Sequence, residues 1–233
     1  MLTAAHCIKD AAAPFDLLAI GGRTDMGSTK ETARHVASVK VHPKFVQSTL
    51  THVAAVITIS SSMPYAPLPV AGPNDSALYS FGKTAKTVGW GRTGTDTSGT
   101  RLKSAVLTLA PLTSCEPFTD PTDSDAQKVC GVTAAGAHDS ICRCDSGGLL
   151  VAGGKVIGVV SEGNKFCDYQ FSVSVFTRVS AVAGALTPVR SGRGRRPAQA
   201  RTRGVQAQLP CRGRPVQTFR RLRVRRLRAR SGY

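Results

Sequence analysis

The stretch "CRCDSGGLL" (residues 142–150) contains a serine followed by two glycines, with a cysteine two residues before the serine. On its own, Asp-Ser-Gly-Gly is most often a turn, because serine and glycine are common turn residues. Two further stretches stand upstream of it, "LTAAHC" (2–7) and "VGWGRTG" (88–94). The interpretation of Ser146 therefore depends on the three motifs together and on the sequence between them.

The segments between the motifs have the short apolar patterns of β-strands, and helical periodicity is weak. "GLLVAGGKVIGVVSEG" (148–163) predicts a hairpin, because two apolar arms flank the turn residues 152–154. Short strands separated by turn residues indicate an all-β sandwich or barrel. The other expected strands are "HVASVKV" (35–41), "HVAAVITI" (52–59), "AVLTLAPL" (105–112) and "FSVSVFTRV" (171–179).

Taken together, the three motifs resemble the trypsin and chymotrypsin family of serine proteases. The resemblance covers about residues 1–182 and includes "HPKF" (42–45), which is similar to a surface loop of the family, and "VFTRVSAV" (175–182), similar to its closing segment. It implies an all-β, two-barrel chymotrypsin-like fold with the active site between the barrels. The first barrel is expected to be incomplete, because strands that the family places before its histidine motif have no counterpart. A fragment or a misplaced start codon would explain this N-terminal truncation.

The charge of the chain divides it into two parts. The net charge is +17, but residues 190–233 contain 15 arginines, no lysine and no acidic residue, so the other 16 basic and 14 acidic residues leave +2. We expect a protease-homologue domain at 1–183 and a disordered arginine-rich tail at 184–233. Specific nucleic-acid binding is not expected, because Phe219 and Tyr233 are the tail's only aromatic residues. An out-of-frame or unspliced translation would give the same arginine bias.

The cysteines lack the spacing of a metal site, and no metal or cofactor is expected. They indicate a disulfide framework and therefore a secreted protein, although "MLTAAHCIKD" has no signal-peptide pattern. No apolar run reaches the length of about 18 residues that a membrane span needs. The resemblance implies that Cys142 pairs with Cys167 and Cys115 with Cys130, and that Cys7 is left unpaired. Two further cysteines have no family counterpart, Cys144 and Cys211.

The resemblance implies that Ser146 is the nucleophile and His6 its general base, with a buried aspartate orienting the histidine. The acid position falls on His52 in "THVAAVITI" (51–59), and Glu31 is the only carboxylate between Lys30 and Asp75. A neutral histidine can accept the hydrogen bond but adds no negative charge, and a protonated one would repel the imidazolium. Neutralising this acid lowers turnover by about 10⁴. We therefore expect a broken triad with vestigial His6 and Ser146.

Cys144 stands where the family has the glycine whose N–H binds the oxyanion. Losing one such donor costs about 10² to 10³ in rate, but an adjusted loop or a disulfide would also accommodate the cysteine. The resemblance assigns Asp145 to the new N-terminus released by activation. Further departures are Leu149 for a proline, Glu162 for a tryptophan, Ile141 beside Ser140 at the base of the specificity pocket, and Ser174 for a glycine on its wall.

These departures predict a secreted, catalytically impaired homologue that acts by binding a protein. Among degenerate members of the family, the chain resembles the glucanase inhibitor proteins of oomycete plant pathogens, which implies a plant endo-β-1,3-glucanase as partner and suppression of host defence. Lys165 and Phe166 are the candidate anchors on the cleft rim. We expect a monomer that binds neither a specific nucleic acid nor a membrane. The alternatives are an active trypsin/chymotrypsin-like endopeptidase and an inactive homologue with another partner.

Overall fold

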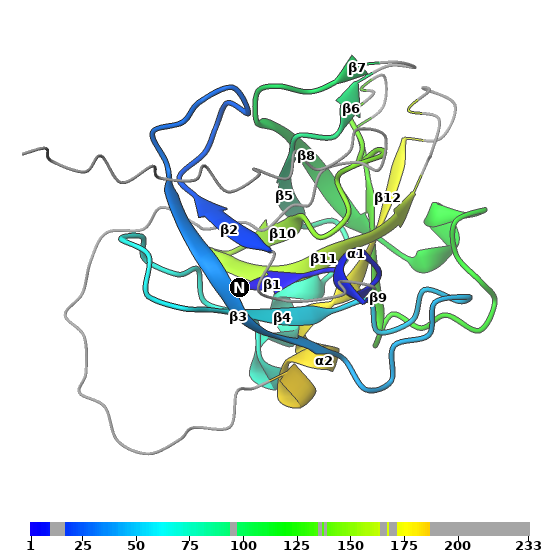
Figure 1. Ribbon diagram of the computed structural model, residues 1–233. Helices are drawn as coiled ribbons and strands as arrows, with labels where there is room; N and C mark the ends of the chain where they lie inside the picture. Colours follow the sequence, from blue (N-terminus) through cyan, green and yellow to red (C-terminus); the bar gives the residue numbers. More distant parts are fainter. Residues whose placement is uncertain are drawn as a thin grey trace, which may run out of the picture.

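The structure is a computed structural model that describes residues 1–9, 17–93, 97–134, 137, 139–163, 167 and 172–186. Within these residues strands dominate and helices are short, as the sequence predicted. Two sheets make up the fold, one open and one closed (Figure 1). This arrangement is consistent with the chymotrypsin-like two-barrel fold. No described helix is long and apolar enough to span a membrane.

The first half of the described chain forms an antiparallel sheet of four strands in the order β1-β4-β3-β2. The register pairs Leu2 with Val56 and Val39 with Ile57. The sheet is open, in agreement with an incomplete first barrel. Its strands are β1 (Leu2–Thr3), β2 (Leu18–Gly21), β3 (Thr32–Val41) and β4 (Ala55–Ile59).

The second half closes into a barrel in the order β10-β11-β12-β9-β8-β5. The predicted hairpin is confirmed as β10 and β11, with Gly153 and Gly154 at positive φ in the turn, where glycine carries no steric penalty. The barrel strands are β5 (Thr84–Gly89), β8 (Lys103–Ala110), β9 (Lys128–Val132), β10 (Leu149–Ala152), β11 (Lys155–Gly163) and β12 (Val173–Arg178). A small pair lies outside it, β6 (Arg92–Thr93) and β7 (Thr97–Ser98).

Alternating side chains of the barrel strands fill its interior. Leu107, Leu150, Ile157 and Phe176 are almost completely buried there, and burial of each such side chain contributes about 1.5–3 kcal/mol. Both predicted disulfides are confirmed. They join Cys115 to Cys130 and Cys142 to Cys167, with Cα–Cα distances of 5.8 and 5.3 Å.

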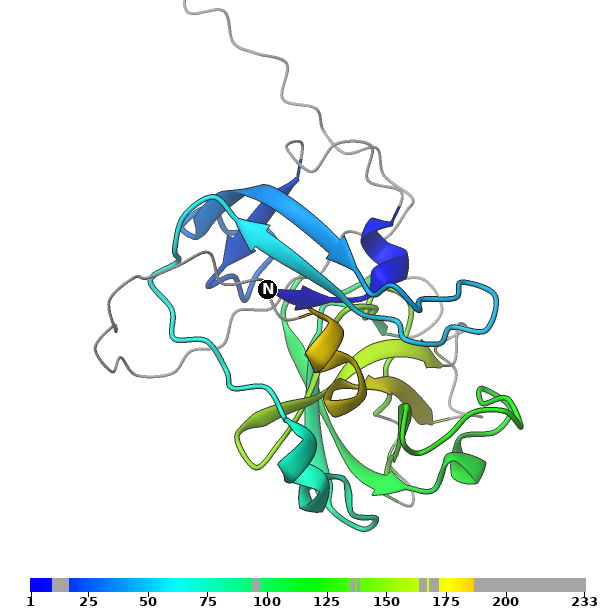
Figure 2. The same cartoon turned by 90° about the horizontal axis from the view of Figure 1, so that it is seen from below.

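The described chain ends with α2 (Val179–Leu186), which runs three residues beyond the expected domain boundary at 183. Its apolar residues recur at helical spacing, and Val182 and Leu186 pack against Ala54 of the first half. Figure 1 shows α2, in gold, at the lower edge of the molecule, below β4, and Figure 2 shows it from below. The rest of the arginine-rich segment, 187–233, lies outside the described residues. The other helical turns are α1 (Ala5–Ile8), η2 (Pro73–Tyr79) and η3 (Leu112–Cys115).

Candidate active site

One buried cluster brings together the three segments that carry the predicted catalytic positions. It contains Ala4, Val53 and Leu149, which lie within three residues of His6, His52 and Ser146, respectively. The Cys7 thiol also donates a hydrogen bond to the backbone carbonyl of Ser146, with an S···O distance of 3.8 Å. The apolar packing at the junction of the two sheets therefore positions this site.

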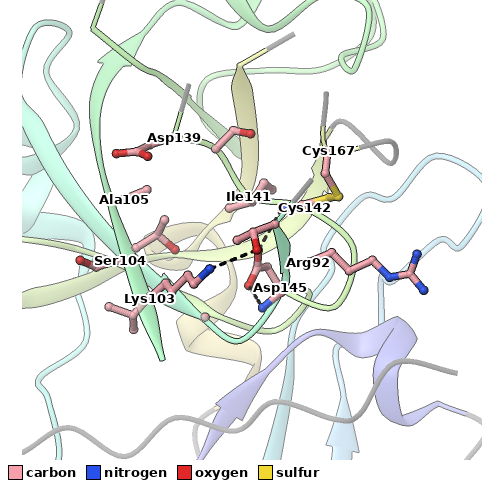
Figure 3. Close-up of a pocket in the computed structure, with 15 residues that line it drawn as sticks. Arg92, Lys103, Ser104, Ala105, Asp139, Ile141, Cys142, Asp145 and Cys167 are labelled. Carbon is pink, nitrogen blue, oxygen red and sulfur yellow. Dashed lines mark hydrogen bonds between the residues drawn. A yellow bond between two sulfur atoms is a disulfide. The ribbon is translucent and has the colours of Figure 1, made fainter. Parts of the chain in front are cut away.

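The loop around Ser146 is held by the side chain of Asp145. The carboxylate accepts hydrogen bonds from the backbone N–H of Gly91, at 2.8 Å, and of Cys142, at 2.9 Å. Figure 3 shows the Asp145 side chain near Cys142 and Arg92, with its hydrogen bonds as dashed lines. A Cβ atom at Gly91 would overlap this carboxylate. Position 91 of the "VGWGRTG" motif therefore requires glycine, because the Asp145 carboxylate that holds the serine loop occupies the space of a side chain there.

A cavity of about 320 Å³ lies beside this loop. It is bounded by the end of β5, the start of β8, the segment 139–142 and Asp145 (Figure 3). Ile141 is on this boundary, but only 4% of its surface is exposed, because its side chain packs into the barrel core.

Ile141 contacts both Ser174, which the resemblance assigns to the wall of the specificity pocket, and the end of β11 at Gly163. Its N–H donates to Ser174 Oγ at 3.1 Å. A Cβ atom at Gly163 would approach the Ile141 side chain to 3.1 Å. The isoleucine side chain therefore lies against the strand end at Gly163.

Cys144 combines an unfavourable backbone conformation with a covalent bond. Its φ of 77° lies in the left-handed region, which glycine adopts freely and which costs other residues roughly 1–2 kcal/mol. Its sulfur is in a disulfide, which was one of the alternatives left open by the sequence. Cys144 is therefore not a simple side-chain replacement of the family's glycine.

At the expected acid position, the ring of His52 is stacked on the ring of His42. The ring centroids are 4.8 Å apart and the planes differ by 13°. His42 was expected on a surface loop but is 5% exposed, because its ring is covered by His52 and its Nδ1 accepts the Lys44 N–H at 3.2 Å. The only indication of this stacking in the sequence is that two histidines stand at the two ends of one loop. This signal does not reveal that the loop folds back on itself.

One ring nitrogen of His6 and one of His52 are buried without a hydrogen bond to any described residue. Nδ1 of His6 and Nδ1 of His52 are both buried, and neither has a hydrogen-bond partner in the described part of the chain. Burial lowers the pKa of His6, and burial followed by the charge of Lys44 lowers the pKa of His52. Burial and then His52 lower the pKa of His42 as well. These shifts favour neutral imidazoles throughout the site near pH 7.

Three described carboxylates, those of Glu31, Glu162 and Asp123, form ion pairs with basic side chains. Glu31 binds Arg23 at 3.2 Å. Glu162, which replaces a tryptophan of the family, binds Lys128 Nζ at 2.6 Å, and Asp123 binds the same ammonium group at 2.8 Å. Lys128 is 3% exposed and also reaches the carbonyl of Thr49 at 3.5 Å, close to His52. Sequence analysis did not identify this ion-pair network, because a lysine at the start of an apolar segment, Lys128, does not indicate which carboxylates it will contact.

Both predicted anchors, Lys165 and Phe166, lie outside the described residues, as does Cys211. Comparison with known proteins agrees with the geometry. A sequence model of the trypsin family matches residues 1–186. A trypsin of Saccharopolyspora erythraea is 30% identical over 182 residues, which cover 78% of this chain and 78% of that protein. Trypsin alpha of Drosophila melanogaster is 28% identical over 184 residues, which cover 78% of this chain and 70% of the fly protein.

Proposed function

The chain belongs to the trypsin family of serine proteases, and we propose that it is a catalytically impaired member that acts by binding another protein. The observation that carries the proposal is the stacking of His52, at the acid position, on His42, while His6 Nδ1 has no partner within the described residues. An aspartate at that position would accept the Nδ1–H of the general base and stabilise the imidazolium formed during attack.

The expected loss is large because the acid acts through its charge. Neutralising it in a trypsin-like triad costs about 10⁴ in turnover, equivalent to roughly 5 kcal/mol of barrier. His52 is held close to Lys44, and this positive charge opposes protonation of its ring. Protonation would in any case place a positive charge beside the imidazolium. Neither state of His52 supplies what the carboxylate supplies.

Three other residues support the proposal, because they lie at positions that the family uses to bind the peptide substrate or the oxyanion. Cys144 carries a disulfide at the oxyanion position. The side chain of Ile141 lies against Gly163, and Glu162 forms an ion pair with Lys128. Each change affects a different interaction with a peptide substrate. Loss at several independent positions is what relaxed selection on catalysis would produce.

The proposed partner is a plant endo-β-1,3-glucanase, whose inhibition would suppress host defence. Two disulfides and the trypsin-family domain indicate an extracellular protein, where such an enzyme can be met. The described core and both disulfides are present although residues needed only for chemistry differ, so a remaining activity is expected to depend on the shape of the surface. Lys165 and Phe166, which lie outside the described residues, remain the proposed anchors for this partner.

An active endopeptidase is the second candidate, because His6 and Ser146 stand at their expected positions and the curated relatives are named trypsins. The two candidates are separated by hydrolysis of a peptide ester and by fluorophosphonate labelling of the full chain. The proposal expects neither above the level of a Ser146→Ala variant. Hydrolysis that Ser146→Ala abolishes would establish the endopeptidase and end the proposal of impaired catalysis.

Binding is tested with a purified endo-β-1,3-glucanase in inhibition and pull-down assays. Full-length protein is used at 0.15 M and 0.5 M salt, together with a synthetic peptide of residues 190–233, because non-specific attraction to the arginines is screened by salt. We expect inhibition by the protein at both salt concentrations and none by the peptide. Phe166→Ala should weaken it and Ser146→Ala should not. No inhibition, or equal inhibition by the peptide, would remove the glucanase from the proposal.

A further inference from the structure

The tripeptide Asn-Asp-Ser begins at Asn74, in the segment "GPNDSALY" (72–79). Asn-X-Ser, with X other than proline, is the acceptor motif for N-linked glycosylation in secreted proteins. The chain has one other asparagine, Asn164, which is followed by Lys-Phe and lacks the motif. Because the motif is short, its use depends on whether the fold leaves the asparagine accessible and has room for a sugar.

Both side chains that the motif requires are on the surface. Asn74 and Ser76 are exposed, and neither forms a hydrogen bond with another described residue. They belong to the first turn of η2, which begins at Pro73. The side-chain amide of Asn74, the group that carries the sugar in a glycoprotein, is therefore accessible.

The middle residue of the motif is turned into the fold. The carboxylate of Asp75 accepts hydrogen bonds from the N–H of Gly72 at 2.9 Å and from Lys155 Nζ at 2.6 Å. At the other end of η2, Tyr79 is buried, and its hydroxyl accepts the N–H of Ser180 at 3.2 Å. These contacts hold the segment from its inner side. The two outer positions of the motif can therefore carry a sugar without displacing a buried group.

We infer that Asn74 is an N-glycosylation site, which carries an N-linked oligosaccharide when the chain passes through the secretory pathway. The inference rests on the extracellular location that the two disulfides and the trypsin-family domain indicate. It depends neither on the identity of the binding partner nor on the catalytic state of Ser146. A failed glucanase assay would leave it standing.

The modification is a glycosyl transfer to the side-chain amide. The donor is an oligosaccharide joined through a pyrophosphate to a polyisoprenoid lipid, and a membrane-bound transferase catalyses the step. Nδ2 of Asn74 forms a bond to the anomeric carbon of the first sugar and loses one proton. The bond between that carbon and the pyrophosphate oxygen breaks, and the lipid pyrophosphate leaves with the electron pair.

The attachment point lies at the opposite end of the β10–β11 hairpin from the loop of Ser146. The Asp75 carboxylate contacts Lys155, the first residue of β11, beside the hairpin turn. The Ser146 loop contacts the same strand at Val160, whose carbonyl accepts the N–H of Gly147. These two points are five residues apart along the strand (160 − 155), or roughly 15 Å. The sugar is therefore anchored away from this loop, on the surface around η2.

Mass spectrometry of the full chain tests the site. The protein is secreted from insect cells behind a cleavable signal peptide and digested with trypsin, which releases Asn74 in peptide 45–83. We expect most of this peptide to carry a glycan that peptide-N-glycosidase F removes, leaving an aspartate at position 74. Peptide 45–83 without a glycan in the secreted protein would overturn the inference.

Three variants separate the motif from the fold. Ser76→Ala removes the hydroxyl that the motif requires, so the glycan should be lost, while the Tm should match that of enzymatically deglycosylated wild type because the position is exposed. Asp75→Asn breaks the ion pair with Lys155 but keeps the motif, and should retain the glycan. Asn164→Gln, at the chain's other asparagine, is the matched control and should also retain it. A glycan that persists in Ser76→Ala, or that disappears in Asn164→Gln, would place the modification elsewhere and overturn the inference.

Discussion

The loop of Ser146 and the segment of His52 meet at the same junction, but they differ in what their residues do there. In the loop, Asp145 holds the backbone through Gly91 and Cys142, and the N–H groups of Gly147 and Gly148 have partners. In the segment, His52 lies on His42 and its Nδ1 has no partner within the described residues. The backbone of the loop is held by hydrogen bonds, whereas the segment has a neutral histidine at the position where our proposal expects the acid of the triad.

The difference shows that positioning and chemistry are separable in this site. The segment of His52 is not loose, since Val53 N–H donates to Thr177 Oγ1 at 3.2 Å and Thr49 is near the buried Lys128. Under our proposal, the segment is held in place by these contacts and differs from an active protease in the side chain at position 52. Repair of the chemistry should therefore need few substitutions, and damage to the framework should cost stability.

The largest effect is expected from repairing the acid and the oxyanion position together. His52→Asp with Cys144→Gly, in a chain extended upstream by the corresponding segment of a trypsin, should raise peptide-ester hydrolysis by at least about 10⁴. Steady-state kinetics measure the gain, and adding Ser146→Ala should abolish it. Equal rates before and after the repair would mean that the site fails for a reason other than these two residues.

The next effect concerns the anchor of the His52 segment. Lys128→Met should lower the free energy of unfolding by about 3–5 kcal/mol, because it leaves Asp123 and Glu162 without their buried cation. Denaturant unfolding measures it. Lys155→Met is the matched control, since Lys155 is 38% exposed in its pair with Asp75 and should cost no more than about 1 kcal/mol. Equal costs for both variants would show that the Lys128 network does not anchor the segment.

A smaller loss is expected from the framework of the Ser146 loop. Gly91→Ala places a Cβ atom against the Asp145 carboxylate and should destabilise the protein by roughly 1–3 kcal/mol. Thermal unfolding compares it with Gly184→Ala in α2, where an added Cβ meets no atom within 4 Å and alanine favours the helix. If Gly91→Ala were as stable as wild type, Asp145 would have to be less tightly held than its hydrogen bonds indicate.

The strands and disulfides were largely predictable, because short sequence patterns indicate them. The hairpin at 148–163 has two apolar arms around Gly153 and Gly154, and the disulfides follow from the family's spacing. The helix α2 continues to Leu186, three residues past the predicted boundary at 183, on apolar contacts with a residue more than a hundred positions away. Local composition could not show that contact.

The contacts inside the site were harder to predict, because they join residues that are distant in the sequence or that carry no motif. The stacking of His42 on His52 depends on the loop between them. The network of Lys128, Asp123 and Glu162 joins β9 to β11, and a lysine in a strand gives no indication of its partners. The bonding of Cys144 was one of three alternatives, since its odd position gave no reason to choose among them.

The smallest effect is the response of the His52 segment to pH. His6, His42 and His52 have folded pKa values below their ordinary value of about 6.5, so the unfolded chain binds protons first as the pH falls. Their neutral forms support the fold above pH 6.5, and this stability is lost as the pH drops from 6.5 towards the lowered folded values. Thermal unfolding should show a lower Tm at pH 5.5 than at 7.5, by a few degrees, since about 1 kcal/mol corresponds to roughly 2–4 °C in a domain of this size. His42→Asn with His52→Asn should flatten this dependence, whereas His35→Asn, on the exposed part of β3, should leave it unchanged. A Tm that falls equally in all three proteins would place the source of the pH dependence outside the stacked histidines.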